Sequence, residues 1–558
     1  MQKEVITFIQ SALELSSEPS VDVPEQASFG HYSTNIAMSL AKEAGKNPRE
    51  LAEEFTAKLN ASNKEEVFEK IEVAGPGFIN FWLSAGTLQR KLQIIDSSKK
   101  LKIGKGQKVI IEYSSPNIAK PMHVGHFRTT IIGDSLANIF EYAGYNVIRW
   151  NYLGDWGTQF GKLIAAYKKW GNREEIEKAP IASLLHLYVR FHKEKDESSE
   201  RAGQQEFKKL AEGDRENRKL WKWFKKLSLE EFEKTYKELG VKFDVVKGES
   251  EYNKGTKELI GELKEKGIAH ESQGAVVVDL ESEGADTAIL EKADGVSVYL
   301  TRELQLLKER RRKYKPDQIL VVVGNEQTLH FKQLGLIAGK LGLLESLNVE
   351  HIKYGLVLGP DGKKFSTREG SLVELNNLLA EAKERTRKLV EQKNPKLSGE
   401  EKEKVSKTVA LGALKYNDLK ENRHSGIVFN WEAMLDFNGN SGPYLQYSYA
   451  RIKSILKKGK KGKADYSKLS EAIELSLVKK LLDFEEVVSL CAQNHLTSYL
   501  ATYLFELAKL SNHYYEKIHI LSDKDTERLS ARLELLEKVG EVLKQGLNLL
   551  GIEVLEEI

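Results

Sequence analysis

The chain has 558 residues, 41% hydrophobic and 30% charged, and this length is too great for a single hydrophobic core. The net charge of +3 is the balance of 85 basic and 82 acidic residues, which excludes nucleic-acid binding through overall charge, so any RNA contact must depend on local patches. One cysteine, Cys491, excludes a disulfide framework and a CxxC zinc site, and fits a reducing cytoplasm. With no signal-peptide pattern and no 18-residue apolar run, we expect a soluble, cytoplasmic, multidomain protein without a membrane partner.

The first 98 residues are predicted to contain both helices and strands. Residues 28–59 place apolar side chains at helical spacing, interrupted at Gly45 and Pro48. Residues 71–84 have the composition of a strand broken by a Gly-Pro-Gly turn. A polar, lysine-bearing stretch then follows, so we expect a small α+β unit over residues 1–98.

A strand, a tight loop and a helix are predicted next. KVIIEYSS (108–115) is apolar and β-branched, as buried strands are. PNIAKP (116–121) contains two prolines that exclude regular structure, and residues 123–144 return to helical spacing. A helix that begins after a strand favours anions, because its free N–H groups and its dipole both attract negative charge.

Two histidines, His123 and His126, lie in the first turn of that helix, with Gly125 leaving room for a flat ring near the backbone. Neither a Walker loop nor a GxGxxG fingerprint is present, so the common nucleotide motifs are absent. Taken alone, the four letters HVGH are also compatible with a histidine pair packed in the core or with two ligands of a metal ion.

The flanking residues give the motif a context. SSPNIAKPMHVGHFRTTIIGDSLANIFEYAGYNVIRWNYLGDWGTQFG (114–161) strongly resembles the active-site block of arginyl-tRNA synthetases, and HVGH resembles the HIGH signature of class I aminoacyl-tRNA synthetases. The resemblance implies an α/β fold. A Rossmann-like parallel-sheet catalytic domain would lie between an N-terminal α+β domain that contacts the D-loop of tRNA and a C-terminal all-helical anticodon-binding domain.

The remaining chain is divided by the same resemblance. The apolar run 319–323 is typical of a parallel strand buried on both faces, and from about residue 400 the periodicity is helical without strand-like alternation. The predicted units are an N-terminal domain (1–98), the first catalytic half with HVGH (99–163), a connective insertion (164–290), the second catalytic half (291–360), a KMSKS-like loop with a stem-contact region (361–400), and the anticodon-binding domain (401–558).

The implied reaction has two steps. The arginine carboxylate attacks the α-phosphorus of ATP, and the arginyl group then passes to the terminal ribose of tRNA(Arg). This chemistry needs positioning and charge neutralisation more than a protein nucleophile. The expected cofactors are ATP and its Mg²⁺, without zinc or another bound metal, and a monomer is the default. The residues predicted to bind ATP are Lys120, His123, Gly125, His126, Lys363, Lys364 and Ser366, with Lys120, His123, His126 and Lys364 as catalytic residues.

The KMSKS-like segment departs from the family. Lys364-Phe365-Ser366-Thr367-Arg368 has Thr367 where the signature carries its second lysine. Family members without the usual motif are thought to use a lysine upstream of HIGH, which is Lys120 here. The alternative is that Lys120 only caps a turn.

Arginine recognition requires carboxylates, because a buried guanidinium needs planar, charged acceptors. The resemblance points to Glu112 and Glu303, although the family usually has aspartate at position 303. Glu303 as a solvent-facing residue paired with a neighbouring arginine is the alternative. The full predicted set is Glu112, Ser115, Pro116, Asn117, His126, Tyr299, Glu303 and Gln327.

Transfer RNA is expected at both ends of the chain. By resemblance, Phe78 would stack on a D-loop base and Asn80 would bond its edge, whereas Phe78 as a core residue is the alternative. The basic stretch from Lys457 to Lys463 fits a phosphate contact or a solvated loop equally well. On the predicted anticodon domain the candidate residues are Tyr444, Gln446, Tyr447 and Arg451.

Two other functions remain open from the sequence. One is a tRNA-binding paralogue without activity, supported by Glu303 and the weak KMSKS match, and opposed by the intact HVGH, Asn117 and Tyr299. The other is a class I synthetase for glutamine, glutamate or cysteine, of which the cysteine enzyme is disfavoured because no cysteine-ligated zinc site is present.

Overall fold

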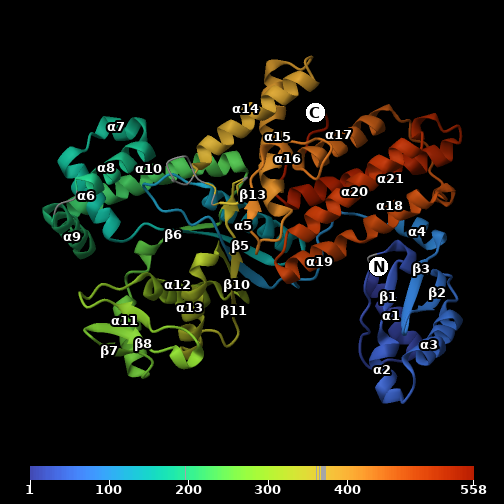
Figure 1. The fold of residues 1–558 in the computed structure, drawn as a ribbon, viewed down its shortest axis with the longest axis horizontal. Helices are drawn as coiled ribbons and strands as arrows, with labels where there is room; N and C mark the ends of the chain where they lie inside the picture. The colour runs from blue at the N-terminus through green and yellow to red at the C-terminus, as the bar shows by residue number, and fades with distance from the viewer. Residues whose placement is uncertain (25, 195–196, 360, 364, 366–372) are drawn as a thin grey trace.

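The computed structural model describes residues 1–558 except 25, 195–196, 360, 364 and 366–372. The molecule is elongated (Figure 1), with the N-terminal unit at one end, a parallel sheet in the middle and the helices of residues 158–239 at the other end. The C-terminal helices lie above the sheet and beside the N-terminal unit in this view.

The N-terminal unit is a three-stranded antiparallel sheet with helices around it, in the order β1-β3-β2. Gly75 and Gly77 have positive φ angles in the Gly-Pro-Gly turn between β2 and β3. The interruption predicted at Gly45 and Pro48 separates two helices, since Gly45 ends α2 and Pro48 opens α3 behind the capping Asn47. The elements are α1 (Gln2–Leu13), β1 (Tyr32–Thr34), α2 (Ile36–Ala44), α3 (Pro48–Ser62), β2 (Phe68–Ala74), β3 (Phe78–Leu83) and α4 (Ala85–Leu92).

The central sheet is parallel throughout, with strand order β11-β10-β4-β5-β6. Its strands are β4 (Lys108–Glu112), β5 (Asn146–Leu153), β6 (Val245–Gly248), β10 (Gln318–Gly324) and β11 (Asn348–Tyr354). The predicted run 319–323 lies in β10, between β4 and β11. This confirms the α/β class expected from the sequence.

Helices cover both faces of the sheet. Val109 and Ile111 of β4 belong to the apolar cluster of α5 (Val124–Tyr142), whereas Ile110 belongs to the cluster of α12 (Tyr299–Tyr314) and α13 (Thr328–Lys340). This alternation follows from the period of two along a strand. The predicted helix over residues 123–144 is α5, and Gly144 follows it with a φ of 91°.

The region predicted as one insertion is divided in the structure by β6, an edge strand of the central sheet. Before β6 come α6 (Thr158–Trp170), α7 (Arg173–Lys178), α8 (Pro180–Lys193), α9 (Glu197–Glu212) and α10 (Arg215–Leu239). After it come α11 (Thr256–Glu265) and a small antiparallel sheet of β7 (His270–Ser272), β8 (Ala275–Val278) and β9 (Ala288–Glu291).

The C-terminal region is helical apart from one short strand. β12 (Val357–Leu358) pairs with β13 (Ile427–Val428), a two-residue strand that the periodicity did not indicate. The helices are α14 (Leu375–Lys393), α15 (Gly399–Leu419), α16 (Trp431–Met434), α17 (Gly442–Lys458), α18 (Ala472–Leu482), α19 (Phe484–Asn494), α20 (Ser498–Lys517) and α21 (Thr526–Leu549).

Arg128 fixes α5 to two other segments. Its side chain is 1% exposed and pairs with Asp418 of α15, with 3.2 Å between Nε and Oδ1. Its Nη1 also donates to the carbonyl oxygen of Gly355, at 2.5 Å. A buried arginine needs such acceptors, so the first turns of α5 keep a defined position relative to α15 and to the segment after β11.

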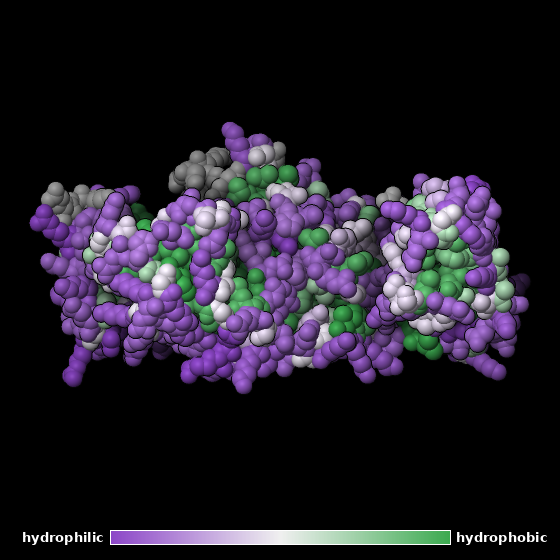
Figure 2. Space-filling view, turned by 90° about the horizontal axis from the view of Figure 1, so that it is seen from below, coloured by the Kyte–Doolittle hydropathy of each residue, from purple (hydrophilic) through white to green (hydrophobic). Residues whose placement is uncertain are grey.

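The face shown in Figure 2 is mostly hydrophilic, with apolar residues in separate patches. Within the part of the chain that the structure describes, no helix has the length and apolar character needed to cross a membrane.

Candidate active site

A pocket of about 320 Å³ lies where β4 and β10 end, against the first turn of α5. In open parallel sheets this edge is where ligands bind. The pocket brings together six of the residues predicted from the sequence, namely Ser115, Asn117, His123, Gly125, His126 and Gln327.

The two histidines cap α5 reciprocally. The Gly125 amide donates to Nδ1 of His123, and the His123 amide donates to Nδ1 of His126, both at 3.1 Å. The two rings stack with centroids 3.8 Å apart. The ring that lies close to Gly125 is that of His123, because a Cβ at position 125 would approach it to 3.0 Å.

This capping determines which ring nitrogen carries the proton. Backbone amides only donate, so Nδ1 of each ring accepts and the proton lies on Nε2. Burial, then the neighbouring charge of His123, lowers the pKa of His126 to about 3. The sequence predicted that free backbone N–H groups at the start of α5 would bind an anion. The Val124 and Gly125 amides already have partners, so the two imidazole N–H groups take over part of this role.

Of the lysines predicted to bind ATP, Lys120 and Lys363 belong to the described residues. Lys120 is half-buried, and its Nζ lies 5.2 Å from the ring centroid of Tyr188 on α8. Its charge reaches the site, since it is one of the groups that lower the pKa of His126. Lys363 is exposed, and Lys364 and Ser366 lie outside the described residues. Phe365, stacked on Phe429 at 4.6 Å, closes the pocket on that side.

Glu112 is paired with a protein cation. Its carboxylate accepts from Nη2 of Arg310, both side chains are about 4% exposed, and the guanidinium stacks on Trp150 with 4.3 Å from Cζ to the ring centroid. Burial raises the pKa of Glu112, and Arg310 opposes this shift. The sequence did not indicate this partner, which takes up part of the negative charge that Glu112 would offer to an arginine ligand.

Glu303 is buried as well, at 4% exposure, which excludes the solvent-facing alternative. Its Oε1 accepts from the Tyr299 hydroxyl at 2.6 Å, and its Oε2 contacts Nε2 of His330 at 2.5 Å. Each oxygen keeps a second lone pair, so the carboxylate can still receive two N–H groups of a guanidinium. The extra methylene relative to aspartate is accommodated by partners on α12 and α13.

Three glutamates of this region, the buried Glu112 and Glu303 and the partly buried Glu249, differ in their cationic partners. Glu249 pairs with Arg302 at 3.0 Å, and burial raises its pKa to about 7. Above pH 7 this pair is neutral, and Glu112 is likewise paired with one arginine, Arg310. Among the described residues Glu303 has no lysine or arginine within ion-pair distance, and its partner is His330, with 2.5 Å between Nε2 and Oε2. Glu303 is therefore the carboxylate of the three that no described lysine or arginine occupies.

His330 is a site residue that the sequence reasoning missed. It follows Gln327 by three positions, in the first turn of α13, and its ring lies 4.9 Å from that of Tyr299. The sequence signal that could have indicated His330 is its position as a polar residue shortly after a buried parallel strand. Its link to Glu303 spans 27 positions and has no local sequence signature.

The Ser115–Asn117 segment forms one wall of the pocket. Asn117 forms a parallel bridge with Gly154, and a Cβ on Gly154 would lie 2.1 Å from the Asn117 Oδ1. Pro116 is buried and its carbonyl accepts from the Gly154 amide at 3.1 Å. Gly154, the first residue of the GDWG motif, therefore allows the two backbones to approach closely, and the wall of the pocket depends on this approach.

The residues predicted to bind tRNA differ in accessibility. Phe78 is 41% exposed at the tip of the β2–β3 hairpin, so it is not a core residue. Asn80 is 3% exposed and its Oδ1 accepts from the Ser33 hydroxyl at 2.7 Å. Its contact with a base remains a prediction that would require this hydroxyl to be displaced.

On α17 the predicted residues divide in the same way. Tyr447 is 38% exposed and Arg451 stacks on its ring at 4.9 Å, whereas Tyr444 is half-buried and its hydroxyl accepts from Asn512. Gln446 is fully buried and donates to the carbonyl oxygens of Thr408 and Glu553. Tyr447 and Arg451 thus form an accessible surface on α17, whereas the buried Gln446 holds this helix from inside the protein.

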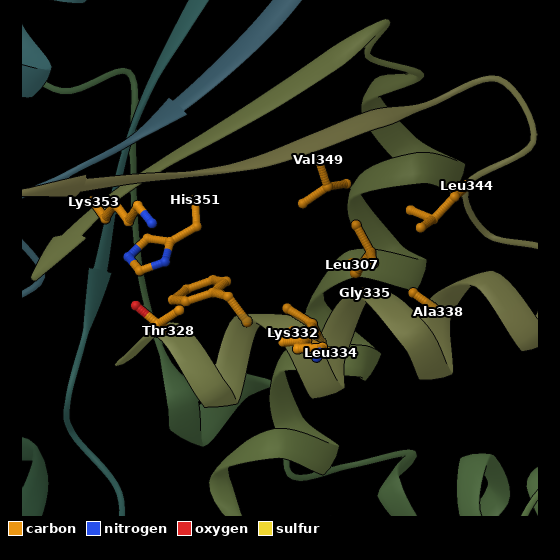
Figure 3. Close-up of a pocket in the computed structure, with 11 residues that line it drawn as sticks. Leu307, Thr328, Lys332, Leu334, Gly335, Ala338, Leu344, Val349, His351 and Lys353 are labelled. Carbon is orange, nitrogen blue, oxygen red and sulfur yellow. The ribbon is translucent and has the colours of Figure 1, made fainter. Parts of the chain in front are cut away.

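A second pocket, of about 230 Å³, lies between β11 and α13 (Figure 3). Its lining includes Val349 and Leu334, with His351 stacked on Phe331 at 4.6 Å. It opens beside the middle of β11 instead of the carboxyl ends of the strands, so it is less suited to a ligand than the pocket at α5. Among the described residues no group of three His, Cys, Asp or Glu side chains could hold a metal ion.

Three family models match the chain. The model described as "tRNA synthetases class I (R), catalytic domain" matches residues 90–431, which is more than half of the chain. "Arginyl tRNA synthetase N terminal domain" matches residues 1–83, and "DALR anticodon binding domain" matches residues 445–558.

Named relatives cover the whole chain. It is 42% identical to the arginine–tRNA ligase of Clostridium beijerinckii and 40% identical to that of Lactobacillus acidophilus, each over 100% of both chains. Among solved structures, the Thermus thermophilus arginyl-tRNA synthetase has a TM-score of 0.84 and 26% identity over 100% of both chains. The Plasmodium falciparum enzyme also has a TM-score of 0.84, with 27% identity over 100% of this chain and 99% of that one.

Proposed function

The chain belongs to the arginyl-tRNA synthetase family, class I, and from this premise we propose that it is an arginine–tRNA ligase, which activates L-arginine with ATP and transfers it to the 3′ end of tRNA(Arg). The observation that carries the proposal is the buried carboxylate of Glu303, which no lysine or arginine of the described residues occupies, in the same domain as a pocket lined by two imidazoles. A guanidinium matches that carboxylate in charge and in shape.

In the first step the arginine guanidinium donates to the remaining lone pairs of the Glu303 carboxylate, which Tyr299 holds in place, with Ser115, Asn117 and Gln327 around the backbone end of the ligand. One carboxylate oxygen of arginine then attacks the α-phosphorus of ATP. A new P–O bond forms, the bond to the β-phosphate oxygen breaks, and pyrophosphate leaves with the electron pair. Nε2–H of His123 and His126 and the Lys120 ammonium stabilise the charge that develops on the phosphates. Mg²⁺ enters as the counter-ion that ATP carries.

In the second step a terminal ribose hydroxyl of tRNA attacks the arginyl carbonyl, and AMP leaves. Phe78 on the N-terminal hairpin and Tyr447 with Arg451 on α17 are the exposed predicted contacts. An aromatic ring and a stacked arginine suit unpaired bases of RNA loops.

We also propose a domain division, a cellular location and an assembly state for this chain. The order of an N-terminal, a catalytic and a C-terminal part is supported by matches over residues 1–83, 90–431 and 445–558, while the individual boundaries remain predictions. A cytoplasmic monomer remains our expectation for its location and assembly, since translation supplies its partners there.

The test is ATP–pyrophosphate exchange, measured with L-arginine in the presence and absence of a tRNA(Arg) transcript. We expect exchange that requires arginine and is low without tRNA, as in the family. Exchange with glutamate, glutamine or cysteine instead would identify another class I synthetase. Binding of the transcript without any exchange would identify an inactive paralogue.

A further inference from the structure

The loop that carries Ser115, Asn117 and Lys120 has an unusual backbone. Ser114, Ser115 and Ala119 have φ angles of 72°, 45° and 60°, in the left-handed region that residues with a Cβ rarely adopt. Such conformations persist only when surrounding groups hold them. Three of them within six residues require identifiable supports.

One support is Tyr236 of α10, whose side chain is buried. Its hydroxyl lies 2.7 Å from Oγ of Ser114 and accepts from Nδ2 of Asn151 at 3.0 Å. Asn151, on β5, in turn accepts from the Ser115 amide through Oδ1 at 3.2 Å. A closed series of hydrogen bonds thus joins Ser114 and Ser115 to β5 and to α10.

A second support is Ser228, about two helical turns before Tyr236 on α10 and fully buried. Its Oγ accepts from the Ala119 amide at 2.9 Å, and its hydroxyl donates to the Phe224 carbonyl at 2.8 Å. The Ala119 amide would otherwise be a buried donor without a partner, which is costly.

The same face of α10 also holds the neighbouring GDWG segment. Lys225 pairs with the buried Asp155 at 2.7 Å, and Nε1 of Trp221 donates to the Asp155 carbonyl at 2.8 Å. Positions 221, 225, 228 and 236 recur at helical spacing and fall on one side of the helix. α10 therefore contacts both segments that form the Ser115–Asn117 wall.

We propose that α10, which lies outside both halves of the parallel sheet, is a positioning element of the active site, with Tyr236 and Ser228 as positioning residues for the 114–120 loop. The inference rests on the proposed function, because it assumes that this loop aligns arginine and Lys120 with ATP. The hydroxyls touch no substrate. They hold the backbone from which Ser115, Asn117 and Lys120 reach the reacting groups.

The variants Tyr236→Phe and Ser228→Ala test this with arginine-dependent ATP–pyrophosphate exchange at saturating tRNA. We expect each to lower kcat by about tenfold or more, because a small misplacement of reacting groups is costly, with KM for ATP and arginine changed less than about threefold. The double variant should lose little more than the worse single variant, since both hold one loop.

Matched substitutions elsewhere in the chain separate an effect on positioning from an effect on stability. Ser530 on α21 is fully buried, accepts from the Gly462 amide and donates to the Thr526 carbonyl, the same two bonds that Ser228 makes. Tyr503 on α20 is buried and donates to the Lys480 carbonyl. Ser530→Ala and Tyr503→Phe should lower the melting temperature as much as the test variants while keeping wild-type kcat.

Two results would overturn the inference. One is a wild-type kcat in both Tyr236→Phe and Ser228→Ala. The other is an equal loss of kcat in the control variants at equal melting temperature. If the wild-type chain itself shows no arginine-dependent exchange, the proposed function fails instead.

Discussion

The two ends of the active site have opposite electrostatics. At the phosphate end, two imidazoles whose Nδ1 atoms are occupied by backbone amides face the pocket with Lys120 nearby. At the guanidinium end, Glu112 and Glu303 are buried and Glu249 is partly buried; Glu112 pairs with Arg310 and Glu249 with Arg302. The comparison shows that each end has little net charge of its own. The charge of a substrate group therefore determines the end of the site at which that group binds.

The first test of this comparison removes the charge of the Glu303 carboxylate. Glu303→Gln should lower kcat/KM for arginine more than about a hundredfold, because a buried guanidinium without its carboxylate costs about 3–5 kcal/mol. Exchange kinetics measure this. Glu303→Asp keeps the charge and should stay within about tenfold. Glu303→Gln with unchanged kcat/KM would show that arginine binds elsewhere.

Removing a cation from the phosphate end should have the next largest effect. Lys120→Ala should lower kcat of adenylate formation by about 10²–10³, with a smaller change in KM for arginine, because the ammonium acts mainly in the transition state. Adding Thr367→Lys should restore part of the loss if the two positions serve one role. Near-wild-type kcat in Lys120→Ala, with none in Lys364→Ala, would assign the charge to the KMSKS-like segment.

Acid should weaken the guanidinium end. As the pH falls below about 7, the value to which burial raises the pKa of Glu249, this carboxylate takes a proton and leaves Arg302 uncompensated near Glu303. KM for arginine should then rise about tenfold between pH 8 and pH 6 through like-charge repulsion. Glu249→Gln should show the raised KM at both pH values. The same pH dependence in that variant would exclude Glu249 as its source.

A hydrogen bond within the guanidinium end should matter least. Tyr299→Phe removes the hydroxyl that donates to Oε1 of Glu303 and should raise KM for arginine by about fivefold, the value of one ordinary hydrogen bond. Isothermal titration with arginine measures the same loss directly. No change in affinity would mean that His330 alone holds the carboxylate.

The parts of this account that the sequence could predict are local. The strand, loop and helix from Lys108 to Tyr142 follow from apolar periodicity and from proline, and HVGH with its flanking residues indicated the site. The partners of the site residues could not be predicted. Arg310 meets Glu112 across 198 positions, and Tyr236 meets Ser114 across 122, so neither contact leaves a pattern in either segment. For the same reason β6 could not be separated from the surrounding insertion.

The most direct test of the central claim compares arginine with citrulline, whose neutral ureido group has nearly the same shape as a guanidinium. The ratio of kcat/KM for the two amino acids should be large in the wild-type chain, fall by about a hundredfold in Glu303→Gln, and stay unchanged in Lys120→Ala although kcat falls. A ratio that is unchanged in Glu303→Gln, or that falls in Lys120→Ala, would contradict the division of the site into a guanidinium end and a phosphate end.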